Sequence, residues 1–177
     1  MDGGEYIGEL VDGLFHGYGV VDDPRDRYAG QWKAGKREGF GVSEFNGAKY
    51  SGEFKAGTFD GVGIIDFANG AQLSGEFSSG SSDGFAVHEF ADGSGYSGQM
   101  VQGAQHGIGV FRYPNGDEYK GQYSRNSAEG AAVYQSNSGQ RTFGLYSQGH
   151  EVSSAPFNAT NREHYEILRD AEEAKVC

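Results

Sequence analysis

Two short segments have the spacing of known catalytic or cofactor-binding motifs. Residues 80–84, Gly-Ser-Ser-Asp-Gly, match the G-x-S-x-G pattern of a serine nucleophile. Residues 93–98, Gly-Ser-Gly-Tyr-Ser-Gly, match the G-x-G-x-x-G pattern of a dinucleotide-binding loop. Both chemistries need a helix directly after the motif, whereas a strand-like pattern follows each segment here. We therefore interpret both segments as turns and expect no catalytic residue, no cofactor and no enzymatic activity.

The histidines do not form a metal-ligand pattern. His16 and His106 each stand immediately before a glycine, at a position that recurs along the chain as an acid. The acids at the recurring position are Glu38, Asp60, Asp83 and Glu129. The single cysteine, Cys177, cannot by itself form a disulfide or a zinc site. We expect a polar turn position rather than a metal site.

These turn residues belong to a repeat of 22 or 23 residues. Each copy opens with a tyrosine, or a residue in its place, followed at period two by a glycine and an aromatic or large apolar residue. Copies begin near residues 6, 28, 50, 73, 96, 119 and 142. Most copies also contain a central glycine, a later Gly-x-Gly and a closing Asn-Gly or Asp-Gly, which favour tight hairpin turns. Each copy therefore predicts a strand, a turn, a second strand and a second turn.

The pattern resembles the MORN (membrane occupation and recognition nexus) repeat, which reads Tyr-x-Gly-x-aromatic, then Gly, then Gly-x-Gly, with a period near 23. The resemblance extends over residues 6–149. The departures from the pattern are Leu73, Ala86, Asn126, Ala132 and Thr142. The resemblance implies an all-β repeat array over residues 1–150, an elongated single-layer antiparallel sheet of about seven stacked β-hairpins.

Residues 151–177 depart from the repeat and predict a linker followed by a C-terminal α-helix. Residues 153–156, Ser-Ser-Ala-Pro, indicate a linker. Thr160 and Glu163 fit a capping box, and residues 161–176 contain good helix formers without Gly or Pro. The helix either covers the open edge of the last hairpin, or binds a partner or a second protomer.

The net charge of −11 disfavours nucleic acid and anionic lipid as partners. Two acidic rows are expected across the hairpins. The row at the mid-hairpin turn is Glu38, Asp60 and Asp83, and the row on the second strands is Asp22, Glu44, Asp66 and Glu89. They form either a solvated face or a binding site for a basic segment.

Aromatic side chains form a further row, which is chiefly structural but is expected to keep one side accessible to an amphipathic partner. The aromatic row consists of Tyr28, Trp32, Tyr50, Phe54, Phe77 and Tyr96. A basic group near the second copy supports an alternative, a peripheral membrane adaptor that binds phosphoinositide head groups. This basic group consists of Arg25, Arg27, Lys33, Lys36 and Arg37.

The resemblance implies a non-catalytic scaffold or adaptor that presents a groove to a helix or extended peptide in cytoskeletal, ciliary or membrane-proximal assemblies. Residues 1–5 lack the features of a secretory signal, Asp2 does not fit an N-myristoylation pattern, and no apolar run is long enough to span a bilayer. A cytoplasmic location is therefore expected. Homodimerisation through the open ends or the tail is a further expectation that the sequence leaves open.

Overall fold

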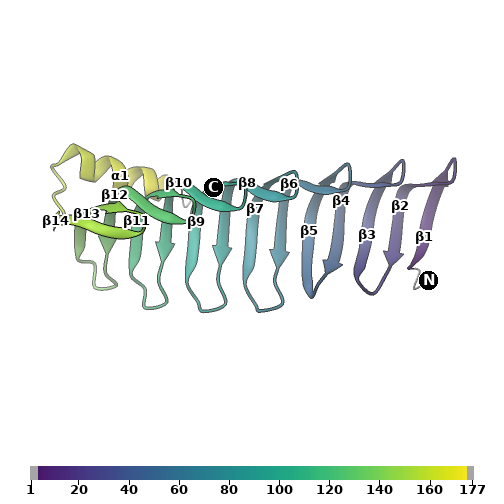
Figure 1. The fold of residues 1–177 in the computed structure, drawn as a ribbon, viewed down its shortest axis with the longest axis horizontal. Helices are drawn as coiled ribbons and strands as arrows, with labels where there is room; N and C mark the ends of the chain where they lie inside the picture. The colour runs from purple at the N-terminus through teal and green to yellow at the C-terminus, as the bar shows by residue number, and fades with distance from the viewer. Residues whose placement is uncertain (1–3, 175–177) are drawn as a thin grey trace. The chain divides into compact units, whose positions relative to one another are not determined.

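The structure is a computed structural model that describes residues 4–174; Asp2, Cys177 and the last residues of the expected helix lie outside the described residues. It consists of one open antiparallel sheet of fourteen strands, forming seven hairpins, and one C-terminal helix (Figure 1). Each strand pairs with the next one in sequence. The strands are β1 (Glu5–Val11), β2 (Leu14–Asp22), β3 (Asp26–Lys33), β4 (Lys36–Phe45), β5 (Ala48–Lys55), β6 (Thr58–Asp66), β7 (Gln72–Ser78), β8 (Ser81–Glu89), β9 (Gly95–Val101), β10 (Ala104–Arg112), β11 (Glu118–Ser124), β12 (Ser127–Gln135), β13 (Arg141–Ser147) and β14 (His150–Pro156).

The turn inside each copy is a two-residue turn in which both residues have positive φ. Ala56 and Gly57, for example, have φ angles of 52° and 97°. Turns with two positive φ angles match the right-handed twist of the flanking strands, which explains the recurrent glycine at the second position. Asn126 replaces that glycine in one copy with a φ of 68°, and its side chain accepts a 2.8 Å hydrogen bond from the amide of Gln105.

A pair of glycines lets each tyrosine ring lie against the backbone. Gly30 pairs with Gly41, and the strand register shifts between Gly30 and Trp32. A Cβ atom on Gly30 would lie 2.5 Å from both the Cα of Gly41 and the Oη of Tyr28. The Tyr28 hydroxyl donates a 2.9 Å hydrogen bond to the carbonyl of Gln31. The glycines are therefore required by the close approach of the ring.

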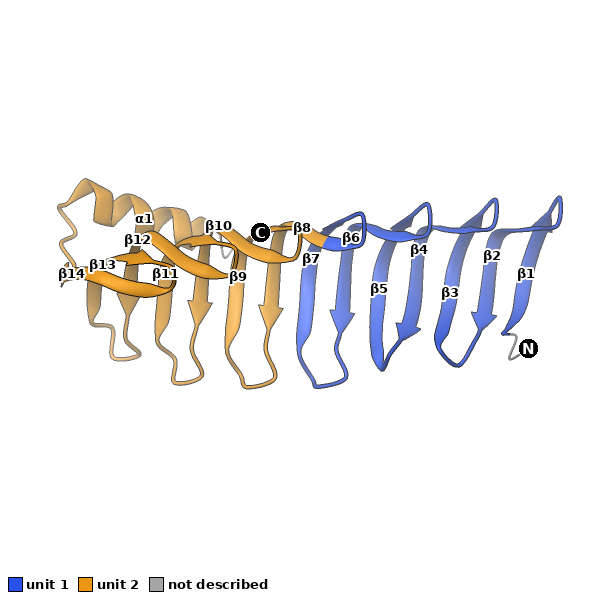
Figure 2. Ribbon diagram, viewed as in Figure 1, with its two compact units in different colours: residues 1–81 blue, residues 82–177 orange. Residues whose placement is uncertain are grey.

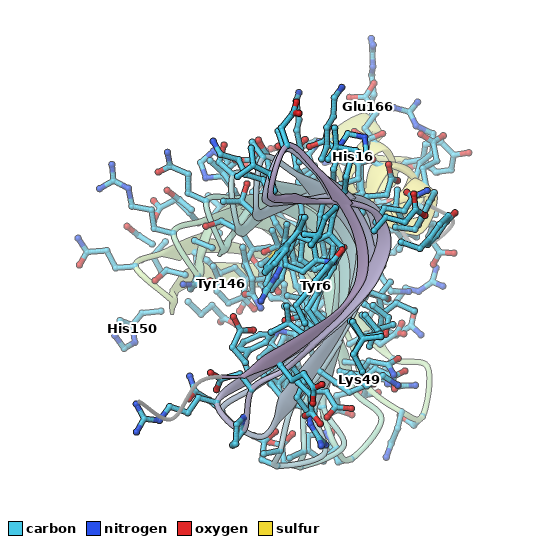
Figure 3. The ribbon with its side chains drawn as sticks, turned by 90° about the vertical axis from the view of Figure 1, so that its right-hand side faces the viewer. Tyr6, His16, Lys49, Tyr146, His150 and Glu166 are labelled. Atoms are coloured by element: carbon cyan, nitrogen blue, oxygen red, sulfur yellow. The ribbon has the colours of Figure 1, made fainter. Side chains whose placement is uncertain are left out.

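The chain divides into two compact units, residues 1–81 and residues 82–177 (Figure 2), called unit 1 and unit 2 below. In unit 1 the inner face of the strands carries the repeat tyrosines, and the opposite face is the outer face. Tyr6 lies within the curve of the strands and Lys49 on its outside (Figure 3). The inner face is an aromatic ladder in which the ring of Tyr50 meets those of Phe54 and Phe77 edge to face, at 5.1 and 5.3 Å.

Unit 2 adds the helix α1 (Arg162–Glu173), whose start differs from the sequence prediction. The N-cap is Asn161, whose side chain accepts hydrogen bonds from the amides of Glu163 and His164. Thr160 is not the cap because its own amide and hydroxyl both donate to the side chain of Asn158. The linker expected at residues 153–156 is wrong, because these residues belong to β14 and pair with β13.

Candidate partner-binding surface

The register of the strands aligns apolar side chains across the outer face of unit 1. Val20 pairs with Ala29, Ala29 with Val42, Val42 with Ser51, and Ser51 with Ile64. On β2, β4 and β6 a further large side chain lies on the same face, two residues before the valine or isoleucine. We call this surface the unit 1 outer patch; it consists of Ile7, Tyr18, Val20, Phe40, Val42, Val62 and Ile64.

The unit 1 outer patch is open to solvent. Tyr18, Phe40 and Val62 are 68%, 66% and 61% exposed. Phe40, Val42, Val62 and Ile64 line a shallow hollow together with the backbone of neighbouring glycines. A contiguous apolar surface of this kind on a folded protein is typical of an interaction site.

Some of the equivalent positions of unit 2, on β10 and β12, are covered by α1. Val110 and Val133, which correspond to Val42 and Ile64, are only 3% and 0% exposed. Ile167 of α1 packs with Val133 in a small apolar core, to which Leu168 and Phe143 add their side chains. The outer face of this sheet is therefore able to bury the apolar side of a helix.

Polar contacts fix α1 along its length. His164 stacks on Phe143 at 3.8 Å, and its Nδ1 accepts a hydrogen bond from the amide of Asn158. At the other end, the Ser97 hydroxyl donates a 3.1 Å hydrogen bond to the carbonyl of Ala174. Between them, the Nζ of the buried Lys120 lies 2.9 Å from a carboxylate oxygen of Glu118 and of Glu172.

The expectation that the helix covers the edge of the last hairpin is wrong. Every residue of β14 is exposed, and α1 instead packs on β10, β11 and β12. Figure 1 shows α1 lying over the strands of unit 2. The apolar stripe of the helix finds more apolar surface on the outer face than on the polar edge strand.

The expectation that one side of the aromatic row stays accessible is also wrong. The curvature of the strands closes the rings against one another, so that none of the six is more than 8% exposed. Burial raises the pKa of both Tyr28 and Tyr50 to about 12. The guanidinium of Arg37 lies over the Tyr28 ring, 4.7 Å from its centroid. The aromatic row is a core, and a role in partner binding for its members stays a prediction.

The acidic row at the mid-hairpin turn has a structural task. The carboxylate of Glu38 accepts a 3.0 Å hydrogen bond from the amide of Ala56, which lies in the turn of the next copy. Asp60 and Asp83 accept the amides of Ser79 and Gln102 in the same way. These hydrogen bonds to turn amides are sufficient to explain why the three positions carry acids. A site for a basic partner at these residues stays a prediction.

The acidic row of the second strands lies on the outer face. Asp22 forms a 2.7 Å ion pair with Arg27, and Asp66 accepts a 2.7 Å hydrogen bond from the side chain of Gln72. Glu44 is exposed between the cross-strand neighbours Arg27 and Lys49. The row therefore borders the unit 1 outer patch, whereas its fourth member, Glu89, belongs to unit 2.

The basic group does not form one cluster. Arg27 and Lys33 both lie on β3, where a separation of six residues corresponds to roughly 20 Å. Lys36 follows Lys33 across the turn, and Arg25 precedes β3. Arg37 points toward the inner face and pairs with Asp26 at 2.5 Å. The structure thus separates the residues on which the lipid-binding alternative depends.

One recurrent residue has a structural role that the repeat pattern alone did not predict. The residue after the first glycine of six copies is Glu or Gln. In the first three copies its side chain accepts a hydrogen bond from a backbone amide of the next strand, beside the shift in strand register. The Glu53 carboxylate accepts a 3.1 Å hydrogen bond from the amide of Val62, and the Gln31 side chain accepts the amide of Phe40 at 2.9 Å. Its recurrence as Glu or Gln was the available signal, because both supply an oxygen acceptor.

Within residues 4–174, no group of three metal-ligating side chains is placed to hold an ion. The helix in this range is also too short and too polar to cross a membrane.

Comparison with known proteins agrees with the repeat pattern. The family model of the MORN repeat matches residues 6–24, 28–46, 50–72, 74–95, 96–118 and 119–141. No curated protein matches the sequence. Among solved structures, the fold is similar to that of the SAS-4 (dCPAP) TCP domain of Drosophila melanogaster, in complex with a proline-rich motif of Ana2 (dSTIL). The TM-score is 0.46 at 12% identity, over 86% of this chain and 88% of that chain.

Proposed function

The chain belongs to the MORN-repeat family, and we propose that it is a non-catalytic scaffold whose unit 1 outer patch binds a segment of a protein partner. The observation that carries this proposal is the contrast between two equivalent surfaces. In unit 2, Val110 and Val133 are buried on the strands that α1 covers, whereas Val20 and Ile64, at the same repeat position in unit 1, are 44% and 41% exposed.

The apolar surface is placed where no folding requirement explains it. The inner face already supplies a core to unit 1, since Tyr28, Tyr50 and Phe54 are no more than 3% exposed. Polar residues at Phe40 and Val62 would leave that core intact. A binding role is the physical reason to present large apolar groups at these two positions.

The context that the resemblance implies, assembly at the cytoskeleton or near membranes in the cytoplasm, is part of the proposal. The shape and charge of the unit 1 outer patch bear only on the kind of segment that is bound and not on this cellular context. The acidic borders of the patch agree better with a protein segment than with an anionic membrane surface.

The test is the double substitution Phe40→Ser and Val62→Ser. Proteins captured from native cells by the wild-type chain are identified, purified and titrated by calorimetry against the wild type and the variant. We expect the variant to lose at least about tenfold in affinity, which corresponds to about 1.4 kcal/mol. Its unfolding midpoint in urea should change little, because both side chains are exposed.

A matched control replaces two apolar side chains of similar exposure outside the patch. Val101 and Val152 are 44% and 64% exposed. The variant with Val101→Ser and Val152→Ser should bind the purified partner like the wild type. If the variant with Phe40→Ser and Val62→Ser bound the partner as tightly as the wild type, the unit 1 outer patch would not be the binding site.

A further inference from the structure

We infer that the segment bound by the unit 1 outer patch is an amphipathic helix with a basic polar side. The inference rests on the proposed function and adds the chemistry of the partner. It follows from two observations, the way in which α1 crosses the strands of unit 2 and the opposite charge balance of the outer face in unit 1.

The path of α1 shows that a helix fits the repeat geometrically. His164 lies on Phe143 of β13, Ile167 on Val133 of β12, and Ala174 reaches Ser97 of β9. The helix thus crosses successive strands instead of running along one. Seven helical residues rise about 10.5 Å, close to the roughly 10 Å between alternate strands. One face of a helix can therefore contact the same position of each successive hairpin.

The charge of α1 matches the face on which it lies. The helix contains five acids, Glu163, Glu166, Asp170, Glu172 and Glu173, against the two bases Arg162 and Arg169. Its partner in the sheet is the buried Lys120, which pairs with Glu172. Like charges that are brought together at an interface disfavour binding, and complementary charges select the partner.

The outer face of unit 1 has the opposite balance. The position equivalent to Lys120 is Ser51, one residue after the copy's tyrosine in both cases. Acids outnumber bases on this face of the strands. The charged residues at outward positions of β1–β7 are the acids Glu5, Glu9, Asp22, Glu38, Glu44, Glu53, Asp60, Asp66 and Glu76 and the bases Arg27, Lys33, Lys36, Lys49 and Lys55, of which Lys33, Lys36 and Lys55 lie beside the mid-hairpin turns. A helix with the charge of α1 would meet repulsion here.

The acids border the apolar side chains on two sides. Glu44 and Asp66 follow Val42 and Ile64 on the same face of β4 and β6. On the other side, the strand register places Glu76 directly beside Val62. A helix whose apolar stripe covers Val42 and Val62 would hold lysines or arginines toward both borders. A second copy's α1 is therefore not the occupant that this surface selects.

The experiment compares two synthetic helical peptides with the same leucine and alanine face. One carries lysine and the other glutamate on the polar side, and each is titrated against the full chain by fluorescence anisotropy at about 0.15 M salt. The lysine peptide should bind at least about tenfold more tightly than the glutamate peptide. The double substitution Glu44→Lys and Glu76→Lys should remove that preference, and Phe40→Ser with Val62→Ser should weaken the lysine peptide by a similar factor.

A charge-matched control carries Glu163→Lys and Glu173→Lys, both on exposed positions of α1 in unit 2. It changes the net charge equally and should leave the lysine peptide's affinity unchanged. Equal or tighter binding of the glutamate peptide overturns the basic-helix inference but leaves the scaffold proposal standing. Binding of neither peptide also overturns the inference, and so does phosphoinositide-vesicle binding that Phe40→Ser with Val62→Ser abolishes. The capture experiment then decides the scaffold proposal separately.

Discussion

Lys120 and Glu172 lie 52 residues apart in the sequence, and their side chains form a 2.9 Å ion pair between β11 and α1. Lys120 is 2% exposed and also contacts Glu118 and Gln135. This lysine is the polar anchor under the helix. The docking of α1 thus depends on one buried charge that no local sequence pattern predicts.

Replacing Lys120 with alanine should detach α1 from the sheet. Removal of one partner from a buried ion pair costs about 3–5 kcal/mol, and we expect the lower end because Glu172 is half exposed and regains water. Unfolding in urea, followed by circular dichroism, measures the loss. Lys120→Met keeps the aliphatic stem and should lose less. An unchanged free energy of unfolding in Lys120→Ala would contradict the anchoring role.

The acceptor at Glu53 should tolerate glutamine but not alanine. Glu53→Gln keeps an oxygen for the amide of Val62, whereas Glu53→Ala leaves that amide without its side-chain partner. The expected loss for alanine is about 0.5–1.5 kcal/mol, with glutamine near the wild type. Similar losses for both substitutions of Glu53 would show that charge, not hydrogen bonding, matters there.

Asparagine at position 56 should stabilise the protein. Ala56 has a φ of 52°, a conformation that costs an L-residue other than Asn, Asp or Gly roughly 1 kcal/mol. Its amide already donates to Glu38, and this contact does not depend on the side chain at position 56. Ala56→Asn creates the Asn-Gly pair preferred in such turns and should add about 0.5–1 kcal/mol to the free energy of unfolding. Gly57→Ala is the opposing control and should destabilise, because the φ of Gly57 is 97°.

Stability should fall in alkaline solution as the buried tyrosines ionise. Burial raises the pKa of Tyr28 and Tyr50 from 10.0 to about 12, so the folded chain holds their protons longer than the unfolded chain. The contribution is complete below the unfolded value and is lost as the pH rises from 10.0 toward about 12. Urea midpoints at about pH 9 and about pH 11 measure the decline.

Tyr28→Phe removes one titrating group and should make the decline less steep. The comparison uses the change in midpoint with pH, since the lost hydrogen bond to Gln31 lowers stability at every pH. A decline of the same steepness in wild type and variant would contradict this assignment to Tyr28.

The sequence was sufficient for the parts of the fold that depend on neighbouring residues. Ala56-Gly57 and Asn46-Gly47 define their turns through backbone preferences that act within two residues. The tyrosine and glycine positions likewise defined the strands and their inner face. For this reason the seven hairpins and the family were predictable.

The features that depend on distant residues were not predictable in the same way. The exposure of Tyr50 depends on how tightly the strands curve. That curvature depends jointly on Gly52, Gly63 and several neighbouring rings. The position of α1 depends on Val133 and Lys120, which look like ordinary second-strand and first-strand residues in the sequence. The unit 1 outer patch corresponds to the surface that α1 covers in unit 2. It could therefore be identified only from the position of the helix.

The turn caps run in one direction along the chain. Glu38 binds the turn that contains Ala56, and Glu129 binds the turn that contains Gln148, so each carboxylate lies in the copy before the turn that it serves. A ribosome releases the earlier copy first. Each of these later hairpins therefore emerges next to a surface that already carries its cap, and the array is suited to grow from its first copy to its last during synthesis.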